Sequence, residues 1–230
     1  MEFTAKYMAA KAAISEIKSG QRLGLGTGST ARYFVDLLGE MVANGFETIC
    51  VPTSIETEKQ ALELNIPLTD LDSLDELDIV IDGADEIDDN MILIKGAGGA
   101  LWREKIVASK AKRMIVIADH SKMVANLGAF PLPIEINQFA WKTTKKQIEN
   151  IGTDYITSNK LKLRIGSNSE PFITDGGHFI VDAFFSRILN AKKLSSALLN
   201  VAGVVQHGLF IDMCDIALIA DDNGVTRYER

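Results

Sequence analysis

The stretch Arg22-Leu23-Gly24-Leu25-Gly26-Thr27-Gly28-Ser29-Thr30 decides the fold class. It begins with a short apolar run, which is followed by a glycine-rich segment. The next residues, 31–42, have large apolar side chains three and four positions apart. They are Tyr33, Phe34, Leu37, Leu38 and Met41. This order predicts a strand, a glycine loop and a helix.

The same alternation surrounds this stretch. We expect a first helix over residues 4–19, ended by Gly20, and after the glycine loop an alternation of apolar strands and helices. The further strands are expected at 47–51, 78–81, 91–94 and 113–118, and the helices at 54–64 and 100–110. Such alternation predicts an α/β fold, a Rossmann-like and mostly parallel sheet flanked by helices, with ligands at the carboxyl ends of its strands.

The pattern changes after Phe130-Pro131-Leu132-Pro133. Strands at 134–136, 160–165 and 178–184, with helices at 142–151 and 192–199, predict a smaller α+β (ferredoxin-like) domain of the split βαβ type. The apolar runs 208–211 and 216–220 are expected to return to the first sheet. We therefore expect a catalytic α/β domain of residues 1–129 and 204–230, and a small domain of residues 130–203.

The composition limits the class of partner. The chain has 230 residues, 47% hydrophobic and 24% charged, as in an ordinary packed globule. Its formal net charge is −7, and it has no basic run that would neutralise a polyanion, so nucleic acid is not an expected partner. Cys50 and Cys214 lie in apolar stretches and are expected to be buried thiols. With no signal-peptide pattern and no 18-residue apolar run, we expect a cytoplasmic protein without membrane contact.

The glycine loop is the first candidate site. Backbone N–H groups at such a helix start favour an anion, and glycines let the anion approach closely. Ser29 stands where a dinucleotide fingerprint has its third glycine, and no lysine precedes it as in a Walker loop. The loop therefore predicts a cup for a single phosphate; the alternative is a tight turn with a Ser or Thr helix cap.

An acidic run, Asp82-Gly83-Ala84-Asp85-Glu86-Ile87-Asp88-Asp89, follows the apolar strand expected at 78–81. Crowded carboxylates must be solvated, paired with cations, bound to metal or adapted for proton transfer. Solvation explains Asp88 and Asp89 well and Asp82 and Asp85 poorly. The EF-hand order is absent, and a magnesium site stays open.

The third candidate is Lys95-Gly96-Ala97-Gly98-Gly99, where a strand again ends and glycines lead into a helix. Glu104 falls early in that helix; taken alone, it is better explained as an exposed helical glutamate. Lys122 follows the strand at 113–118 and by default is a surface lysine. His120, His178 and His207 show no ligand spacing, which argues against a histidine metal site or a serine triad.

Together these residues suit proton transfer beside a carbonyl. A carboxylate can remove a carbon-bound proton, a lysine can stabilise the developing enolate oxygen, and a second acid can move hydroxyl protons. The interconversion of an aldose and a ketose phosphate needs those parts and no cofactor.

Five blocks of the chain resemble the type A ribose-5-phosphate isomerases in order and spacing, over nearly the whole length. They are Gly26–Thr30, Asp82–Glu86, Lys95–Leu101 with Arg103-Glu104-Lys105, Phe130–Pro133, and Gly203-Val204-Val205 with Gly208-Leu209-Phe210. The resemblance implies interconversion of D-ribose 5-phosphate and D-ribulose 5-phosphate through a cis-enediolate, in the non-oxidative pentose phosphate pathway. It also implies that no metal takes part and that the chain forms a homodimer or homotetramer.

The resemblance also implies roles for single residues. Glu104 would carry the proton between C1 and C2, Asp82 would assist ring opening, Asp85 would hold sugar hydroxyls and Lys95 would stabilise the enediolate oxygen. Substrate contacts are expected from Thr27, Gly28, Ser29, Thr30, Asp82, Gly83, Ala84, Asp85, Lys95, Gly96, Ala97, Gly98, Lys122 and Lys6.

Two residues depart from the pattern of the resembled family. Gly176 stands where relatives often have Asn, which we expect to affect only a surface turn, and His120 stands where many have a small residue, close to Lys122. Two other functions stay open on the residues alone: a sugar-phosphate sensor without catalysis, and a magnesium-dependent sugar phosphatase that uses the acidic run.

Overall fold

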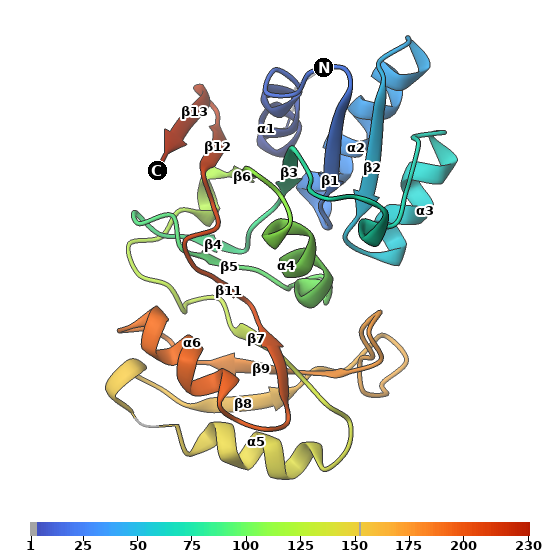
Figure 1. Cartoon of the computed structure of the whole chain (residues 1–230). Helices are drawn as coiled ribbons and strands as arrows, with labels where there is room; N and C mark the ends of the chain where they lie inside the picture. Colours follow the sequence, from blue (N-terminus) through green and yellow to red (C-terminus); the bar gives the residue numbers. More distant parts are fainter. Residues whose placement is uncertain (1–3, 152) are drawn as a thin grey trace. The chain divides into compact units, whose positions relative to one another are not determined.

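The computed structural model describes residues 4–151 and 153–230, which form two compact units (Figure 1). In the described part, the first unit comprises residues 4–84, 103–122 and 212–230, and the second comprises residues 85–102 and 123–211. The second unit is thus larger than the small domain expected at 130–203, because it also includes 85–102, 123–129 and 204–211. The domain boundaries expected from the sequence stay a prediction.

The first unit is built on a six-stranded sheet of order β13-β12-β6-β3-β1-β2. All neighbouring pairs are parallel except the β12–β13 hairpin. Its strands are β1 (Gln21–Leu25), β2 (Thr48–Pro52), β3 (Ile79–Asp82), β6 (Met114–Asp119), β12 (Ile216–Asp221) and β13 (Gly224–Glu229). Its helices are α1 (Ala5–Ile14), α2 (Ser29–Ala43) and α3 (Ile55–Glu63), with most of α4 (Leu101–Ser109) and the 3-10 turns η1 (Leu71–Ser73) and η2 (His120–Lys122). The predicted α/β class is confirmed.

The strand order places a ligand-binding position in this sheet. From β1 the chain passes to β2 on one side, whereas β3, β6 and β12 follow on the other. The direction of winding therefore reverses between the neighbours β1 and β3, and crevices at the carboxyl ends of strands at such a point are where open α/β sheets bind ligands. The glycine loop leaves β1 at this point, and Asp82 ends β3.

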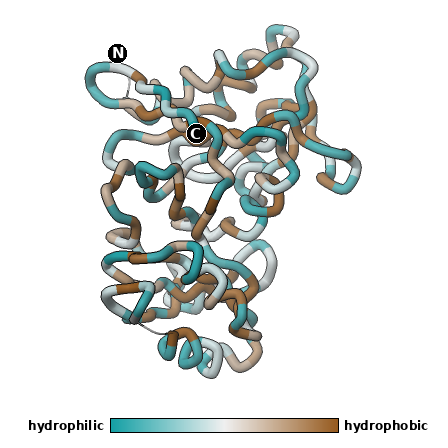
Figure 2. The backbone as a smooth tube through the Cα atoms, turned by 60° about the vertical axis from the view of Figure 1, so that its left-hand side comes forward, coloured by the Kyte–Doolittle hydropathy of each residue, from teal (hydrophilic) through white to brown (hydrophobic). Residues whose placement is uncertain are grey.

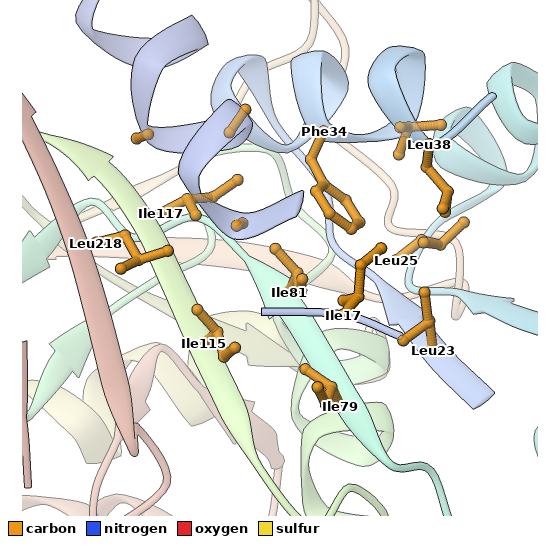
Figure 3. Close-up of a cluster of buried hydrophobic side chains, with 14 of the residues drawn as sticks. Ile17, Leu23, Leu25, Phe34, Leu38, Ile79, Ile81, Ile115, Ile117 and Leu218 are labelled. Carbon is orange, nitrogen blue, oxygen red and sulfur yellow. The ribbon is translucent and has the colours of Figure 1, made fainter. Parts of the chain in front are cut away.

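Apolar side chains of the strands and helices form the core of this unit (Figure 3). Phe34 and Leu38 of α2 pack over Leu25 of β1 and Ile81 of β3, and all four are inaccessible to solvent. Because inner parallel strands are buried on both faces, their sequences read as continuous apolar runs. Cys50 and Cys214 are buried free thiols, as expected, and burial raises the pKa of Cys50 to about 12.

The first helix is shorter than predicted. It ends at Ile14 with Ser15 as its C-cap, not at Gly20. Ile17 lies beyond the helix and packs into the core with 7% of its surface exposed. Burial of this side chain favours turns in residues 15–20 over continuation of the helix.

A four-stranded antiparallel sheet of order β10-β7-β9-β8 dominates the second unit. Its strands are β7 (Leu132–Ile136), β8 (Lys160–Leu163), β9 (Phe179–Phe184) and β10 (Val204–His207), with helices α5 (Trp141–Glu149) and α6 (Ala191–Leu199) and the turn η3 (Thr153–Tyr155). This βαββαβ order confirms the ferredoxin-like prediction. The sequence analysis did not include the fourth strand, β10.

A three-stranded antiparallel sheet, β11-β5-β4, corrects one expectation. Its strands are β4 (Glu86–Ile87), β5 (Leu93–Ile94) and β11 (Leu209–Phe210). The apolar runs 91–94 and 208–211 therefore pair with each other, and only 216–220 joins the parallel sheet, as β12. Two-residue strands carry too little periodicity to reveal their partner.

Hydrophobic and hydrophilic residues both occur throughout the coloured part of the trace (Figure 2). Among the described residues, no helix combines the length and the apolar character needed to cross a membrane.

Candidate active site

Asp82 is fixed against the glycine loop at the carboxyl end of β3. Its Oδ1 accepts hydrogen bonds from the backbone N–H of Thr27 (3.1 Å) and of Gly83 (2.7 Å). Only 1% of its surface is exposed. Gly26 allows this approach, because a Cβ there would lie 2.3 Å from Asp82 Oδ1 and 2.5 Å from its Cα. The predicted proximity of the loop and this carboxylate is therefore present within the first unit.

The hydroxyl of Thr27 belongs to a cluster that the sequence analysis missed. Thr27 Oγ1 lies 2.7 Å from Thr53 Oγ1 and 3.2 Å from Thr57 Oγ1, and donates to Ser54 Oγ at 2.8 Å. Thr57 in turn donates to the Gly26 carbonyl at 2.9 Å. These contacts fasten the glycine loop to the turn between β2 and α3. The run Thr53-Ser54 at a strand end was the available signal.

The start of α2 has the form of an anion site. Its N-cap is Gly28, at φ +113°, and no side chain caps it, so the alternative of a Ser or Thr cap is wrong. The N–H groups of a first helical turn have no partner within the helix and attract negative charge. Lys6 Nζ donates to Ser29 Oγ at 2.9 Å, which brings a cation to this helix start.

Lys122 lies near the same lysine, as the electrostatics of Asp119 at the end of β6 show. Partial burial alone would raise the pKa of Asp119. Hydrogen bonds from Ser121 and the positive charges of Lys122 and Lys6 outweigh burial, and the pKa lies below its ordinary value. Both lysines predicted for the phosphate end therefore act on one carboxylate. His120 is solvent-exposed in the turn η2.

Glu104 lies in the first turn of α4 and is 4% exposed, so the interpretation as a solvent-exposed helical glutamate is wrong. Its neighbour Lys105 is half-buried. Burial lowers the pKa of Lys105 to about 7, which outweighs the opposite effect of the Glu104 charge.

The second unit holds Lys95, on the loop that follows β5, and Asp85, directly before β4. Lys95 is 2% exposed; its backbone N–H donates to the Gly208 carbonyl at 2.9 Å, and its Nζ lies 5.4 Å from the ring centroid of Phe210. Asp85 Oδ2 accepts from the Ala97 N–H at 2.9 Å. Asp85, the loop 95–99 and Gly208 thus meet within the second unit.

Glu86, the last residue of the acidic motif, has a different environment from Asp85. It is 3% exposed, and its two carboxylate oxygens accept hydrogen bonds from the backbone N–H groups of Gly128 and Phe130. These bonds attach the segment before β7 to the short strand β4. Glu86 is therefore a structural residue.

Gly176 does more than form a surface turn, which corrects the expectation from the sequence. A Cβ at this position would lie 2.7 Å from Trp102 Cζ3 and 3.2 Å from His178 Nδ1. His178 Nδ1 also lies 3.0 Å from Oε1 of the buried Glu135. Burial raises the pKa of Glu135, and the hydrogen bonds from Thr174 and His178 only partly offset that effect.

Over the described residues, no group of three or more His, Cys, Asp or Glu side chains has an arrangement suited to a metal ion. Three carboxylates of the acidic run, Asp82, Asp85 and Glu86, accept hydrogen bonds from backbone N–H groups.

Comparison with known proteins assigns the family. The model of the family "Ribose 5-phosphate isomerase A (phosphoriboisomerase A)" matches residues 49–224. The chain belongs to this family. A ribose-5-phosphate isomerase A of Sinorhizobium fredii is 54% identical over 95% of this chain and 94% of its own, and one of Rhodopseudomonas palustris is 52% identical over 98% and 97%.

Solved structures of the family agree over nearly the full length. A D-ribose-5-phosphate isomerase in complex with phospho-erythronic acid has a TM-score of 0.92 and 39% identity, over 98% of both chains. The ribose 5-phosphate isomerase of Plasmodium falciparum has a TM-score of 0.92 and 39% identity, over 98% of this chain and 97% of its own. The resemblance found in the sequence is therefore confirmed at the level of the family and its fold.

Proposed function

We propose that this chain is a ribose-5-phosphate isomerase that interconverts D-ribose 5-phosphate and D-ribulose 5-phosphate. The observation that carries the proposal is its full-length similarity, at 39% identity, to an isomerase that binds phospho-erythronic acid. The carboxylate of that compound has two oxygens on a planar carbon, like a 1,2-enediolate. A family site that holds such a group suits the aldose–ketose reaction.

Glu104 is the proposed base. It removes the proton from C2 of the open-chain aldose and returns it to C1 of the enediolate, so that no net proton is gained or lost. The low exposure of Glu104 supports this role, because a shielded carboxylate keeps the proton from exchanging fully with bulk water between the two steps.

Asp82, Asp85 and Lys95 are proposed to handle the oxygens. Asp82 assists ring opening and moves hydroxyl protons, from a position held by the Thr27 and Gly83 amides. Asp85 holds sugar hydroxyls. The Lys95 ammonium stabilises the enediolate oxygen, and its 2% exposure makes that charge more effective than it would be in water.

The phosphate is proposed to bind at the N-terminus of α2. The amides of Gly28, Ser29 and Thr30 supply donors, and Lys6 and Lys122 supply positive charge. Gly83 and Ala84 after Asp82, and Gly96, Ala97 and Gly98 after Lys95, complete the proposed set of substrate contacts. They leave room for the sugar because they carry small side chains or none.

The reaction requires no cofactor or metal, because proton transfer is its only chemistry. We further propose that the protein works in the cytoplasm, in the non-oxidative pentose phosphate pathway, and assembles as a homodimer or homotetramer. Sedimentation equilibrium of the 25.1 kDa chain would measure that assembly.

The test is an assay of the purified chain with ribose 5-phosphate in the presence of a chelator. We expect ketose to form at an undiminished rate, and Glu104→Gln to lose about three or more orders of magnitude in kcat, as loss of a general base does. Glu63→Gln, at an exposed position on α3, is the matched control. Release of inorganic phosphate that the chelator stops would support a magnesium phosphatase, and binding without turnover would support a sensor.

A further inference from the structure

Arg164 follows strand β8 in the second unit, and the sequence analysis did not single it out. Its Nε donates to Asp182 Oδ2 at 3.0 Å, and its Nη2 donates to Asp182 Oδ1. The side chains are only 15% and 20% exposed. A two-point pair of this kind fixes the plane of the guanidinium, so the direction of its remaining N–H groups is fixed too.

The remaining nitrogen of Arg164 faces the loop that follows β5. Its Nη1 donates to the carbonyl oxygens of Gly96 (2.9 Å) and Ala97 (3.0 Å). Hydrogen bonds from a charged donor are stronger than those between neutral groups. One side chain thus holds two consecutive peptide groups of a loop that contains five glycine or alanine residues in a row, 96–100.

Phe172 completes the support of this loop. Its ring lies 5.9 Å from the Arg164 guanidinium carbon, and its backbone N–H donates to the Arg164 carbonyl at 2.9 Å. A Cβ at Gly99 would lie 2.5 Å from the Phe172 ring, so the loop rests directly on this aromatic side chain.

The loop held by Arg164 also determines the position of Asp85. The carbonyl of Ala97 accepts from Arg164, while the N–H of Ala97 donates to Asp85 Oδ2 at 2.9 Å. If the carbonyls of Gly96 and Ala97 were released, the Ala97 N–H would no longer be held toward the carboxylate. A continuous series of hydrogen bonds therefore runs from Asp182 through Arg164 and Ala97 to Asp85.

We propose that Arg164 is a positioning residue of the isomerase reaction. Arg164 holds the peptide groups of Gly96 and Ala97, and the Ala97 N–H in turn keeps the Asp85 carboxylate oriented toward the sugar hydroxyls. This inference rests on the proposed function. A lysine cannot replace Arg164 fully, because a single ammonium cannot bind both oxygens of Asp182 and both carbonyls in one plane.

Amide hydrogen exchange at Ala97 tests the structural half of the inference without any assay of activity. In Arg164→Met we expect the exchange rate of the Ala97 N–H to rise by about tenfold or more relative to the wild type. Loss of hydrogen bonds from a charged donor produces a factor of this size. Arg164→Lys should fall between the two, and serves as the test if the methionine variant does not fold. Arg187→Met, which removes an exposed arginine of the same unit, should leave Ala97 unchanged. Equal exchange in all variants would overturn the proposal.

A double-mutant cycle with Asp85→Asn tests the functional half. We expect Arg164→Met to lower kcat/KM by about ten- to hundredfold in the wild-type background, and by less than about threefold once Asp85 is already replaced. A purely structural role predicts the same factor in both backgrounds, and that result would overturn the proposal. A wild type that does not isomerise would overturn the proposed function, and with it the proposed effect of Arg164 on the reaction. Exchange of the Ala97 N–H would still decide whether Arg164 orders the loop.

Discussion

At the scale of single residues, the described part of the chain buries five carboxylate or ammonium side chains: Asp82, Glu86, Lys95, Glu104 and Glu135. Burying a charge is costly unless specific partners compensate for it. Glu86 accepts hydrogen bonds from two backbone amides, and Glu135 accepts one from Thr174 and lies beside His178. These partners compensate for the burial of both carboxylates. The other three are the proposed base, acid and enediolate-stabilising lysine, and of these Asp82 also binds two backbone amides.

The contact between Gly26 and Asp82 leads to a prediction for stability. Gly26→Ala should lower the free energy of unfolding by about 1 to 3 kcal/mol, the usual cost of overpacking, because the new Cβ meets the Asp82 backbone, which cannot move away easily. Gly83→Ala is the control, since its Cβ would meet nothing closer than 3.9 Å. Urea unfolding of both variants checks this, and equal stabilities would contradict the packing described.

The ion pairs of Asp78 lead to a prediction for pH. Hydrogen bonds from the side chain of Arg22, its backbone N–H and Lys112 hold the Asp78 pKa well below its ordinary value, against the opposing effect of partial burial. A lowered folded-state pKa adds stability that is present in full above the unfolded pKa and is lost as the pH falls toward the folded one.

Asp78→Asn should therefore be less stable than the wild type by about 1 to 2 kcal/mol at pH 7, and the two unfolding curves should converge as the pH falls below about 4. Asp222→Asn, in the exposed turn between β12 and β13, should match the wild type throughout. A difference between wild type and Asp78→Asn that stays constant from pH 7 to pH 3 would contradict this assignment.

At the scale of elements, long apolar runs and glycine turns predicted most strands and helices within a few residues. The strands β3 and β6 are buried in the parallel sheet, so their sequences are apolar up to the aspartate that ends each of them. Strands such as β4 and β13 were not predicted, for different reasons. β4 has only two residues, and β13 is an exposed edge strand with mostly polar side chains. Tertiary pairing, not local pattern, defines such strands.

The candidate site was predictable from the sequence to the extent that it depends on local motifs. Gly26–Thr30 and Lys95 directly follow strand ends, and Asp82 is the last residue of its strand. Arg164 and the hydroxyls of Thr53, Ser54 and Thr57 were missed because contacts between distant segments determine their roles. Nothing in an isolated Arg164 distinguishes it from a surface arginine.

The short strand β4 leads to a prediction about the segment before β7. Glu86→Ala should lower the free energy of unfolding by about 2 to 4 kcal/mol, because the Gly128 and Phe130 amides lose a charged acceptor inside the protein. Glu86→Gln keeps one acceptor oxygen and should lose about half as much. Thermal or urea unfolding measures both, and a fully stable alanine variant would contradict the anchoring role.

At the scale of the whole molecule, the formal charge of −7 opposes the approach of a dianionic substrate. Local cations must therefore provide the attraction. Lys6 and Lys122 both act on Asp119, and the uncapped N-terminus of α2 lies beside Lys6. The proposed phosphate site at the start of α2 is thus consistent with the acidic character of the protein as a whole.

Proton transfer between C2 and C1 is the central claim, and hydrogen exchange at substrate C2 tests it most directly. The wild type, incubated with C2-deuterated ribose 5-phosphate in water with a chelator present, should release part of the deuterium to the solvent as ketose forms, because a carboxylate-held proton exchanges partly with water before it reaches C1. Glu104→Gln should bind the substrate with little change in affinity and leave the deuterium at C2 of the aldose. Ketose that retains all of the deuterium at C1, with none released to the solvent, is the result of a hydride shift and would contradict the account, as would undiminished exchange by Glu104→Gln.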